Sequence, residues 1–333
     1  MEDLTEFGPA LLRNPDALRV ARPSFIVGGI QQHTFREMGD AFQPDYHTRG
    51  HRLAFAATFH SERPDLYIAD LHSRKLVRKT NDPRHSYAFP AFNARGDLIA
   101  FASDRAGNWD LYIMSADRNT APVQVTSSSM DEIHPTWFER YDPMGNVLER
   151  KMAYCAHNDL SDEWEIWVLD LLTMTPTFVT RGMYPEWEPS GQSTDPVGGR
   201  GRRLAFQRAR ERGDPWFSIW TIDTETYEEV EIVSGGTWAA ITPTWSPDGR
   251  YIAYATVHQS PAAKDEDRIW KADDIWIVDT EGNLTVQLTS DDDPDSDPVW
   301  ADDWWIYFLK ERNGTKNAYS IYPEILRHIE PEK

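Results

Sequence analysis

Short apolar stretches alternate with polar turns along the chain, and the same alternation returns about every 50 residues. Its most regular part is an aliphatic residue, an alanine and an aromatic residue, a pattern typical of a buried β-strand. The last copy has tyrosine in place of alanine. The six copies are Leu53-Ala54-Phe55, Ile99-Ala100-Phe101, Met152-Ala153-Tyr154, Leu204-Ala205-Phe206, Ile252-Ala253-Tyr254 and Ile306-Tyr307-Phe308.

A second strand follows each of these, with an acidic or polar residue first and an aromatic residue third. Its copies are Asp65-Leu66-Tyr67, Asp110-Leu111-Tyr112, Glu165-Ile166-Trp167, Ser218-Ile219-Trp220, Asp274-Ile275-Trp276 and Asn317-Ala318-Tyr319. A further element, led by proline, opens each unit. Its copies are Pro90-Ala91-Phe92, Pro135-Thr136-Trp137, Pro185-Glu186-Trp187, Pro243-Thr244-Trp245 and Pro298-Val299-Trp300, with Asp40-Ala41-Phe42 as an imperfect first copy.

A weaker fourth element precedes each opening, as in Val123-Gln124-Val125-Thr126 and Val286-Gln287-Leu288-Thr289. Four short strands repeated six times predict an all-β fold, a six-bladed β-propeller of four-stranded antiparallel blades. The blades open near residues 40, 90, 135, 185, 243 and 298, within a propeller over 23–323. Residues 24–30 are expected to close the last blade, 1–22 to form a partly helical extension, and 324–333 a tail.

The clearest unit resembles the repeat of the TolB-like propeller family, also described as PD40 or WD40-like. It runs from Pro243 to Tyr254 with the turn Ser246-Pro247-Asp248-Gly249, and blade two adds Ser103-Asp104-Arg105. The likeness covers about residues 40 to 322. It implies a docking platform in the bacterial envelope, in the periplasm, that binds a protein partner.

The net charge of the chain limits the classes of molecule that it is expected to bind. The net charge of −20 argues against nucleic acid, because phosphate binding needs clustered Lys and Arg. It is compatible with binding cations or a basic protein patch, although such a charge more often reflects a well-solvated acidic surface. No stretch reaches the roughly 18 apolar residues of a membrane span. The first residues lack the features of a signal peptide, so the protein is cytoplasmic or an export signal has been removed.

Six of the ten histidines fall in loops that a propeller places on one face: His33, His60, His85, His134, His157 and His258. Neutral imidazole is a common transition-metal ligand and a ready acid or base near pH 7. This predicts a metal or ligand site at the channel mouth, drawn chiefly from His85, His134, His157 and His258. The alternative is that they are separate, solvated loop residues, since none has chelating spacing.

An acidic run, Asp291 to Asp297, opens blade six on the same face. Alternating carboxylates suggest a calcium loop, but Ser296 stands where an EF-hand needs glycine. A looser cation site is expected at Asp293, Asp295 or Asp297. With His85 and His134 these are the candidate metal ligands, for calcium or manganese.

Asp104 and Arg105 are candidate ligand contacts, with a structural ion pair as the alternative. Arg208, Arg210 and Arg212 alternate after a strand, and Arg210 is a further candidate for binding an anionic group. The chain has no Gly-x-Ser-x-Gly elbow, phosphate loop, dinucleotide fingerprint or cysteine-based zinc site.

These absences favour a non-catalytic propeller that binds a protein or a saccharide-like ligand through its channel mouth. The second hypothesis is a metal-assisted lyase or hydrolase on an acidic saccharide or lactone, because some oligogalacturonide lyases resemble this repeat. There, His134 or His85 would bind the metal, and Arg105 or Arg210 would hold a substrate carboxylate.

Overall fold

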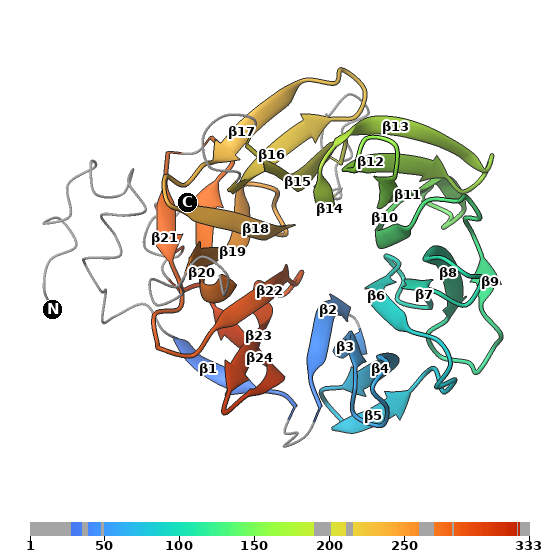
Figure 1. Cartoon of the computed structure of the whole chain (residues 1–333), viewed down its shortest axis with the longest axis horizontal. Coiled ribbons are helices and arrows are strands. Elements are labelled where there is room, and N and C mark those ends of the chain that lie inside the picture. The colour runs from blue at the N-terminus through green and yellow to red at the C-terminus, as the bar shows by residue number, and fades with distance from the viewer. Residues whose placement is uncertain are drawn as a thin grey trace, which may run out of the picture.

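The computed structural model describes residues 28–34, 39–47, 50–189, 201–210, 216–259, 270–281, 283–324 and 326. Six four-stranded antiparallel sheets stand in a ring around a central axis (Figure 1). The predicted six-bladed propeller is therefore confirmed. The predicted N-terminal helix and most of the tail lie outside the described residues. Within the described parts of the chain, no helix is both long and apolar enough to cross a membrane.

Each blade is built from strands that follow one another in sequence, the innermost first. Blade one contains β2 (Ala41–His47), β3 (Arg52–Ala57), β4 (Asp65–Asp70) and β5 (Lys75–Arg78). Blade two contains β6 (Tyr87–Phe92), β7 (Leu98–Ser103), β8 (Asp110–Ser115) and β9 (Val123–Gln124). Blade three contains β10 (Glu132–Tyr141), β11 (Val147–Asn158), β12 (Glu163–Asp170) and β13 (Thr175–Arg181).

The second half of the ring repeats this order until the chain closes. Blade four contains β14 (Met183–Trp187), β15 (Arg203–Ala209), β16 (Phe217–Asp223) and β17 (Glu229–Val233). Blade five contains β18 (Trp238–Trp245), β19 (Tyr251–Gln259), β20 (Trp270–Asp279) and β21 (Thr285–Gln287). Blade six contains β22 (Asp295–Trp300), β23 (Ile306–Arg312), β24 (Thr315–Tyr322) and β1 (Gly28–Gln32).

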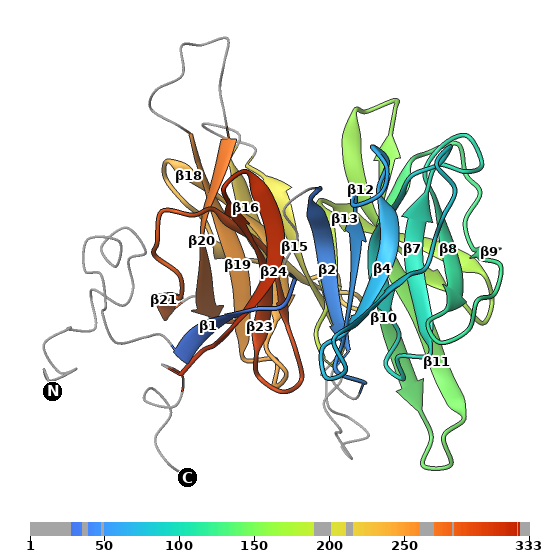
Figure 2. The ribbon, with the colours of Figure 1, turned by 90° about the horizontal axis from the view of Figure 1, so that it is seen from below.

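Strand β1 joins the two ends of the chain. It pairs antiparallel with β24, with Gln31 opposite Ser320 and Gln32 opposite Tyr319. The outer strand of blade six thus comes from the N-terminal side, the role expected for residues 24–30, of which 28–30 are described. Figure 2 shows the blades from the side, with the long β10–β11 hairpin extending beyond the others.

Alanine in the second strand lets neighbouring blades approach. Ala205 of β15 is fully buried and packs with Trp245 and Tyr254 of blade five. A larger side chain there would push the blades apart, because interiors are packed as densely as organic crystals. At the ring closure the alanine is replaced by Tyr307, whose ring stacks on Tyr46 of blade one at 4.0 Å between centroids.

The acid-led strand and the weaker fourth element are joined by side-chain hydrogen bonds. In blade two, the Leu111 amide donates to Thr126 Oγ1 at 2.9 Å, and Gln124 Nε2 donates to Asp110 Oδ2 at 3.1 Å. These bonds satisfy buried polar groups where the short outer strand β9 ends. The same threonine bond recurs at Leu66 with Thr80 and at Ile275 with Thr289.

The opening of blade one differs from its expected position. The residue after each opening proline pairs with the alanine of the second strand, as Ala91 does with Ala100. In blade one it is Asp45 that pairs with Ala54, so the opening element is Pro44-Asp45-Tyr46 rather than Asp40-Ala41-Phe42. Its third residue is tyrosine, whereas the other five copies have phenylalanine or tryptophan there.

Candidate functional site

Every innermost strand has a bulge at its opening proline. In β6 the pairing with β7 breaks between Ala88 and Ala91, and in β10 the pairing with β11 breaks between Ile133 and Thr136. The other four innermost strands break at the same place. A bulge redirects side chains and is common beside functional sites. This bulge occurs in all six blades.

The residue before each of these prolines has a left-handed backbone, although none is glycine. The φ angles are 46° at Gln43, 54° at Phe89, His134 and Tyr184, 49° at Thr242 and 51° at Asp297. Residues with bulky or branched side chains rarely adopt such angles, and a following proline normally favours extended backbone. Each such residue costs roughly 1–3 kcal/mol, and such strain tends to cluster at functional sites.

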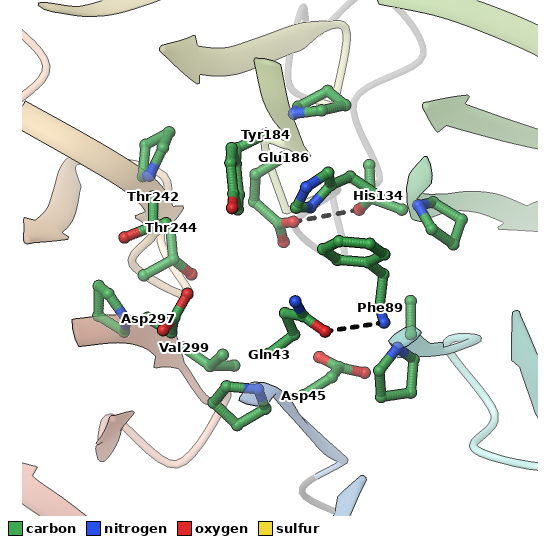
Figure 3. A pocket seen from close by; sticks show the side chains of 18 of the residues that line it. Gln43, Asp45, Phe89, His134, Tyr184, Glu186, Thr242, Thr244, Asp297 and Val299 are labelled. Carbon is green, nitrogen blue, oxygen red and sulfur yellow. Dashed lines mark hydrogen bonds between the residues drawn. The ribbon is translucent and has the colours of Figure 1, made fainter. Parts of the chain in front are cut away.

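The residues on either side of the six prolines line a central cavity of about 210 Å³ (Figure 3). We call those before the prolines the pre-proline ring and those after them the post-proline ring. The pre-proline ring is Gln43, Phe89, His134, Tyr184, Thr242 and Asp297. The post-proline ring is Asp45, Ala91, Thr136, Glu186, Thr244 and Val299.

His134 is held between two aromatic side chains of the pre-proline ring. Its ring centroid lies 3.8 Å from that of Phe89 and 3.7 Å from that of Tyr184. The side chain is only 9% exposed, and burial lowers its pKa to about 3, so the imidazole is neutral at pH 7. The described residues offer its ring nitrogens no hydrogen-bond partner.

Two carboxyl groups of the post-proline ring stand on blades one and four, which face each other across the channel (Figures 1 and 3). Asp45 Oδ2 accepts a hydrogen bond from the Phe92 amide at 2.6 Å, and Glu186 Oε2 accepts one from Thr136 Oγ1 at 3.2 Å. Although both touch the channel, protein surrounds them. Burial raises the pKa of Asp45 to about 7, and burial together with the charge of Asp45 raises that of Glu186 to about 8.

The remaining polar groups of the pre-proline ring are also poorly solvated. Burial raises the pKa of Asp297, whose Oδ2 accepts a hydrogen bond from Ser296 Oγ at 2.9 Å. Burial and the charge of Asp297 raise the pKa of Tyr184. The Thr242 hydroxyl is buried without a hydrogen-bond partner.

The described side chains that line the cavity include acids but no strong bases. Among the described residues that line the cavity, none is a lysine or an arginine. Within the described parts of the chain, no three His, Cys, Asp or Glu side chains lie close enough to hold a metal ion together. The channel can therefore accept hydrogen bonds and positive charge, and donate hydrogen bonds from protonated carboxyl groups.

Of the predicted channel-mouth and metal residues, His134 and Asp297 line the cavity, while the others lie outside it. His85 Nδ1 lies 3.5 Å from Asp104 Oδ1, so the structure brings these two together. His157 contacts Asp159 at 3.1 Å and Asp162 at 3.3 Å. The ring of His258 stacks on Trp238 at 6.4 Å.

The predicted arginine contacts are engaged within the protein. Arg105 lies over the rings of Tyr87 and Tyr112, at 5.6 and 5.4 Å from their centroids. Arg210 Nε donates to the Trp216 carbonyl at 3.4 Å. Asp104 also accepts the Ser86 amide at 2.8 Å, which orders the loop that leads into β6.

The acidic run before β22 is divided among three surroundings. Asp293 pairs with Arg312 at 2.8 Å, and Asp295 pairs with the buried Lys310 at 2.8 Å. Asp297 alone turns into the channel, because the bulge at Pro298 redirects it. The three carboxylates expected to share one cation thus point to different partners.

The sequence analysis did not identify Asp45 and Glu186 as site residues. A usable signal was present, because each follows an opening proline and every such position lines the channel. Asp45 and Glu186 have carboxyl groups where Ala91 and Val299 have apolar side chains. Blades one and four are therefore the two blades with an acid at this position.

Comparisons with known proteins agree with this geometry. The Tol-Pal system protein TolB of Francisella tularensis subsp. holarctica (strain OSU18) is 22% identical over 208 residues, covering 62% of this chain and 43% of that protein. The crystal structure of TolB from Acinetobacter baumannii superposes with a TM-score of 0.58 and 16% identity, over 78% of this chain and 57% of that one. This chain is a six-bladed β-propeller that is similar to TolB.

The TolB-like chain spans less than half the length of the curated relatives it matches. An oligogalacturonate lyase in complex with manganese superposes with a TM-score of 0.54 and 13% identity, over 89% of this chain and 94% of the lyase. That likeness shows the shared fold alone. No family model matches the chain.

Proposed function

We propose that this TolB-like propeller is a non-catalytic platform that takes a segment of a partner protein into its channel. The observation that carries the proposal is the double ring of side chains, to which all six blades contribute around one cavity. The backbone strain repeated in the pre-proline ring supports a role for these positions beyond stability. From the resemblance to TolB, we propose that it works in the bacterial envelope.

The chemistry of the channel favours binding over reaction. A nucleophilic mechanism needs a base within hydrogen-bond reach of a nucleophile and a group that orients the base. Among the described residues, His134 has aromatic neighbours but neither of these partners. Cys155 is fully buried, and burial raises the pKa of its thiol, so it is a packing residue.

The lining also separates the two functional hypotheses. A lyase or hydrolase on an acidic saccharide needs a cationic group to hold the substrate carboxylate. Arg105 and Arg210 do not line the cavity, whereas three carboxyl groups do. An acidic saccharide would meet like charge there. The described residues therefore support binding of a neutral or basic segment.

A displayed library of random peptides, panned against the purified protein, tests the platform. The variant Val299→Phe fills the channel from the post-proline ring, and Leu160→Phe adds a ring of equal size at a residue that is 99% exposed. We expect selected peptides to bind the native protein and Leu160→Phe equally, and Val299→Phe at least tenfold more weakly. Ala91→Leu is a second, smaller block, and thermal unfolding verifies that each variant folds.

Peptides that bind Val299→Phe and Ala91→Leu as tightly as the native protein would contradict the proposal. Enrichment of peptides that bind elsewhere on the ring would do the same. Binding of a neutral oligosaccharide, sensitive to both blocks, would replace the protein segment by a sugar as the occupant of the channel.

A further inference from the structure

Two polar side chains in the channel wall have no hydrogen-bond partner among the described residues. The Thr242 hydroxyl is enclosed by protein, whereas His134 is 9% exposed, makes only ring contacts and lines the cavity. Buried polar groups normally have partners, so each exception calls for an explanation. A ligand in the cavity, which the three carboxyl groups also line, would supply a partner for the His134 imidazole.

We infer that the channel holds one protonated organic amine, a lysine side chain or an N-terminal ammonium, between Asp45 and Glu186. The inference rests on the proposed function, since the amine belongs to the segment that the channel takes up. Blades one and four are opposite in the ring, so the two carboxyl groups approach an ammonium from opposite sides (Figure 3). An ammonium has three donors, which suit two carboxylates and a third acceptor such as the neutral imidazole of His134.

Other ligand classes fit less well. An anion would meet Asp45, Glu186 and Asp297 with no lysine or arginine in the described lining. A metal ion needs several ligands at about 2.0–2.6 Å, and the described side chains do not group in this way. An ammonium spans longer distances because its contacts are hydrogen bonds of about 2.8 Å. The rings of Phe89 and Tyr184 offer further attraction to a cation.

The charges around the two carboxyl groups determine their response to pH. Asp302, in the turn before β23, and Asp45 act on each other as like charges, and Asp45 acts in the same way on Glu186. Near Asp297, Lys316 of β24 provides partial compensation. His134 is neutral, so it adds no positive charge.

Both carboxyl groups hold protons over part of the neutral range, because their pKa values are about 7 and about 8. A bound ammonium favours the ionised carboxylates and therefore releases protons. Affinity for an amine must then rise with pH. One released proton from a group of pKa about 7 corresponds to a tenfold gain between pH 6 and pH 8.

Isothermal titration with two probes tests the inference. The probes are Nα-acetyl-lysine methylamide and its Nε-acetylated counterpart, which has the same chain but no charge. We expect the charged probe to bind at least tenfold more tightly than the acetylated one, and at least tenfold more tightly at pH 8 than at pH 6. Titrations in Tris and in phosphate, whose ionisation enthalpies differ, count the protons released.

Variants assign the effect to the channel. Asp45→Asn and Glu186→Gln keep the side-chain shapes. Each variant should lower the affinity ratio of the charged to the acetylated probe by at least tenfold. Each should also release one proton fewer on binding. Asp293→Asn removes a carboxylate outside the channel and should leave both quantities unchanged. Equal binding of the two probes, or an affinity that does not rise with pH, overturns the inference.

The two proposals can fail separately. If peptides bind in a manner sensitive to Val299→Phe while the two probes do not differ, the platform stands and the amine is wrong. If the charged probe binds equally to the native protein and to Asp45→Asn and Glu186→Gln, it binds outside the channel, and the inference falls. If neither the affinity of the peptides nor that of the probes changes in the blocking variants, both proposals are wrong.

Discussion

Four buried acids of the blades each have a basic side chain beside them, whereas the three half-buried acids that line the channel have none at ion-pair distance among the described residues. In the blades, four buried acids pair with a basic side chain at 2.5 to 2.8 Å. These pairs are Asp65 with Arg78, Glu139 with Arg150, Glu188 with Arg203 and Asp295 with Lys310. In the channel, Asp45, Glu186 and Asp297 have no lysine or arginine at ion-pair distance among the described residues.

The difference separates the channel acids from these four paired acids of the blades. A buried charge is costly unless it is paired and hydrogen-bonded, and the basic side chains supply that pairing in the blades. Asp45 and Glu186 have raised pKa values, as does the paired blade acid Asp295, but they differ from it in lining the central cavity. A group with a raised pKa that faces a cavity is a candidate for binding, and these two have no basic side chain beside them among the described residues.

The largest expected effect comes from breaking a pair in the blades. Lys310 is 1% exposed and lies 2.6 Å from Asp291 and 2.8 Å from Asp295. Lys310→Ala leaves Asp295 buried and uncompensated, and should lower the free energy of unfolding by about 3–5 kcal/mol. Urea denaturation at pH 7 measures it. The matched control, Arg312→Ala, removes an exposed partner of Asp293 and should cost about 0–1 kcal/mol.

A loss below about 1 kcal/mol for Lys310→Ala would mean that Asp295 takes up a proton or water without strain. The blade acids would then resemble the channel acids, and the comparison would lose its basis.

The second prediction concerns the channel, where replacing an acid should increase the free energy of unfolding at high pH rather than lower it. The folded-state pKa of Glu186, about 8, lies above its ordinary value of 4.5, so the protonated folded state is favoured and stability is lost as pH rises between these values. Glu186→Gln removes this loss. Its stability relative to the native protein should increase by up to about 1.4 kcal/mol per pH unit between pH 5 and pH 8.

Chemical denaturation of both proteins at pH 5, 6.5 and 8 follows this difference. Asp293→Asn serves as the control, because its carboxylate is paired with Arg312 outside the channel. A Glu186→Gln variant that is less stable than the native protein at pH 8 would show that Glu186 contributes to folding as the blade acids do.

The smallest effect is expected at His134. Burial lowers its folded-state pKa to about 3, so the unfolded state binds a proton more readily and stability falls as pH drops below about 6.5. His134→Phe keeps an aromatic ring between Phe89 and Tyr184 and cannot be protonated. The two proteins should be within about 1 kcal/mol at pH 7.5, with the variant about 2 kcal/mol more stable at pH 5.

Thermal unfolding at the two pH values is sufficient for this test. If the variant is no more stable than the native protein at pH 5, His134 is solvated in the folded state, and its neutral role in the channel lining is wrong.

The blades could be predicted from the sequence because their signals are local. The aliphatic-alanine-aromatic pattern, the acid-led strand and the opening proline each lie within a few residues, and six copies confirm one another. The first opening was misaligned by four residues, since Pro44-Asp45-Tyr46 has tyrosine where the other openings have phenylalanine or tryptophan. The loop histidines were chosen as site residues by residue type, and most of them lie outside the cavity. A histidine in a loop can face solvent or the channel, and its residue type does not tell which.

The sequence alone determined the number of blades, the four strands in each and the residues that pack between them, because burial on alternate faces of a strand repeats every second residue. Only the tertiary structure decided which side chains share the channel. Asp45 and Glu186 are separated by three blades of sequence, and the closing of a six-membered ring sets them opposite each other. Burial raises both pKa values, and the charge of Asp45 raises that of Glu186 further, so no local sequence pattern could predict them.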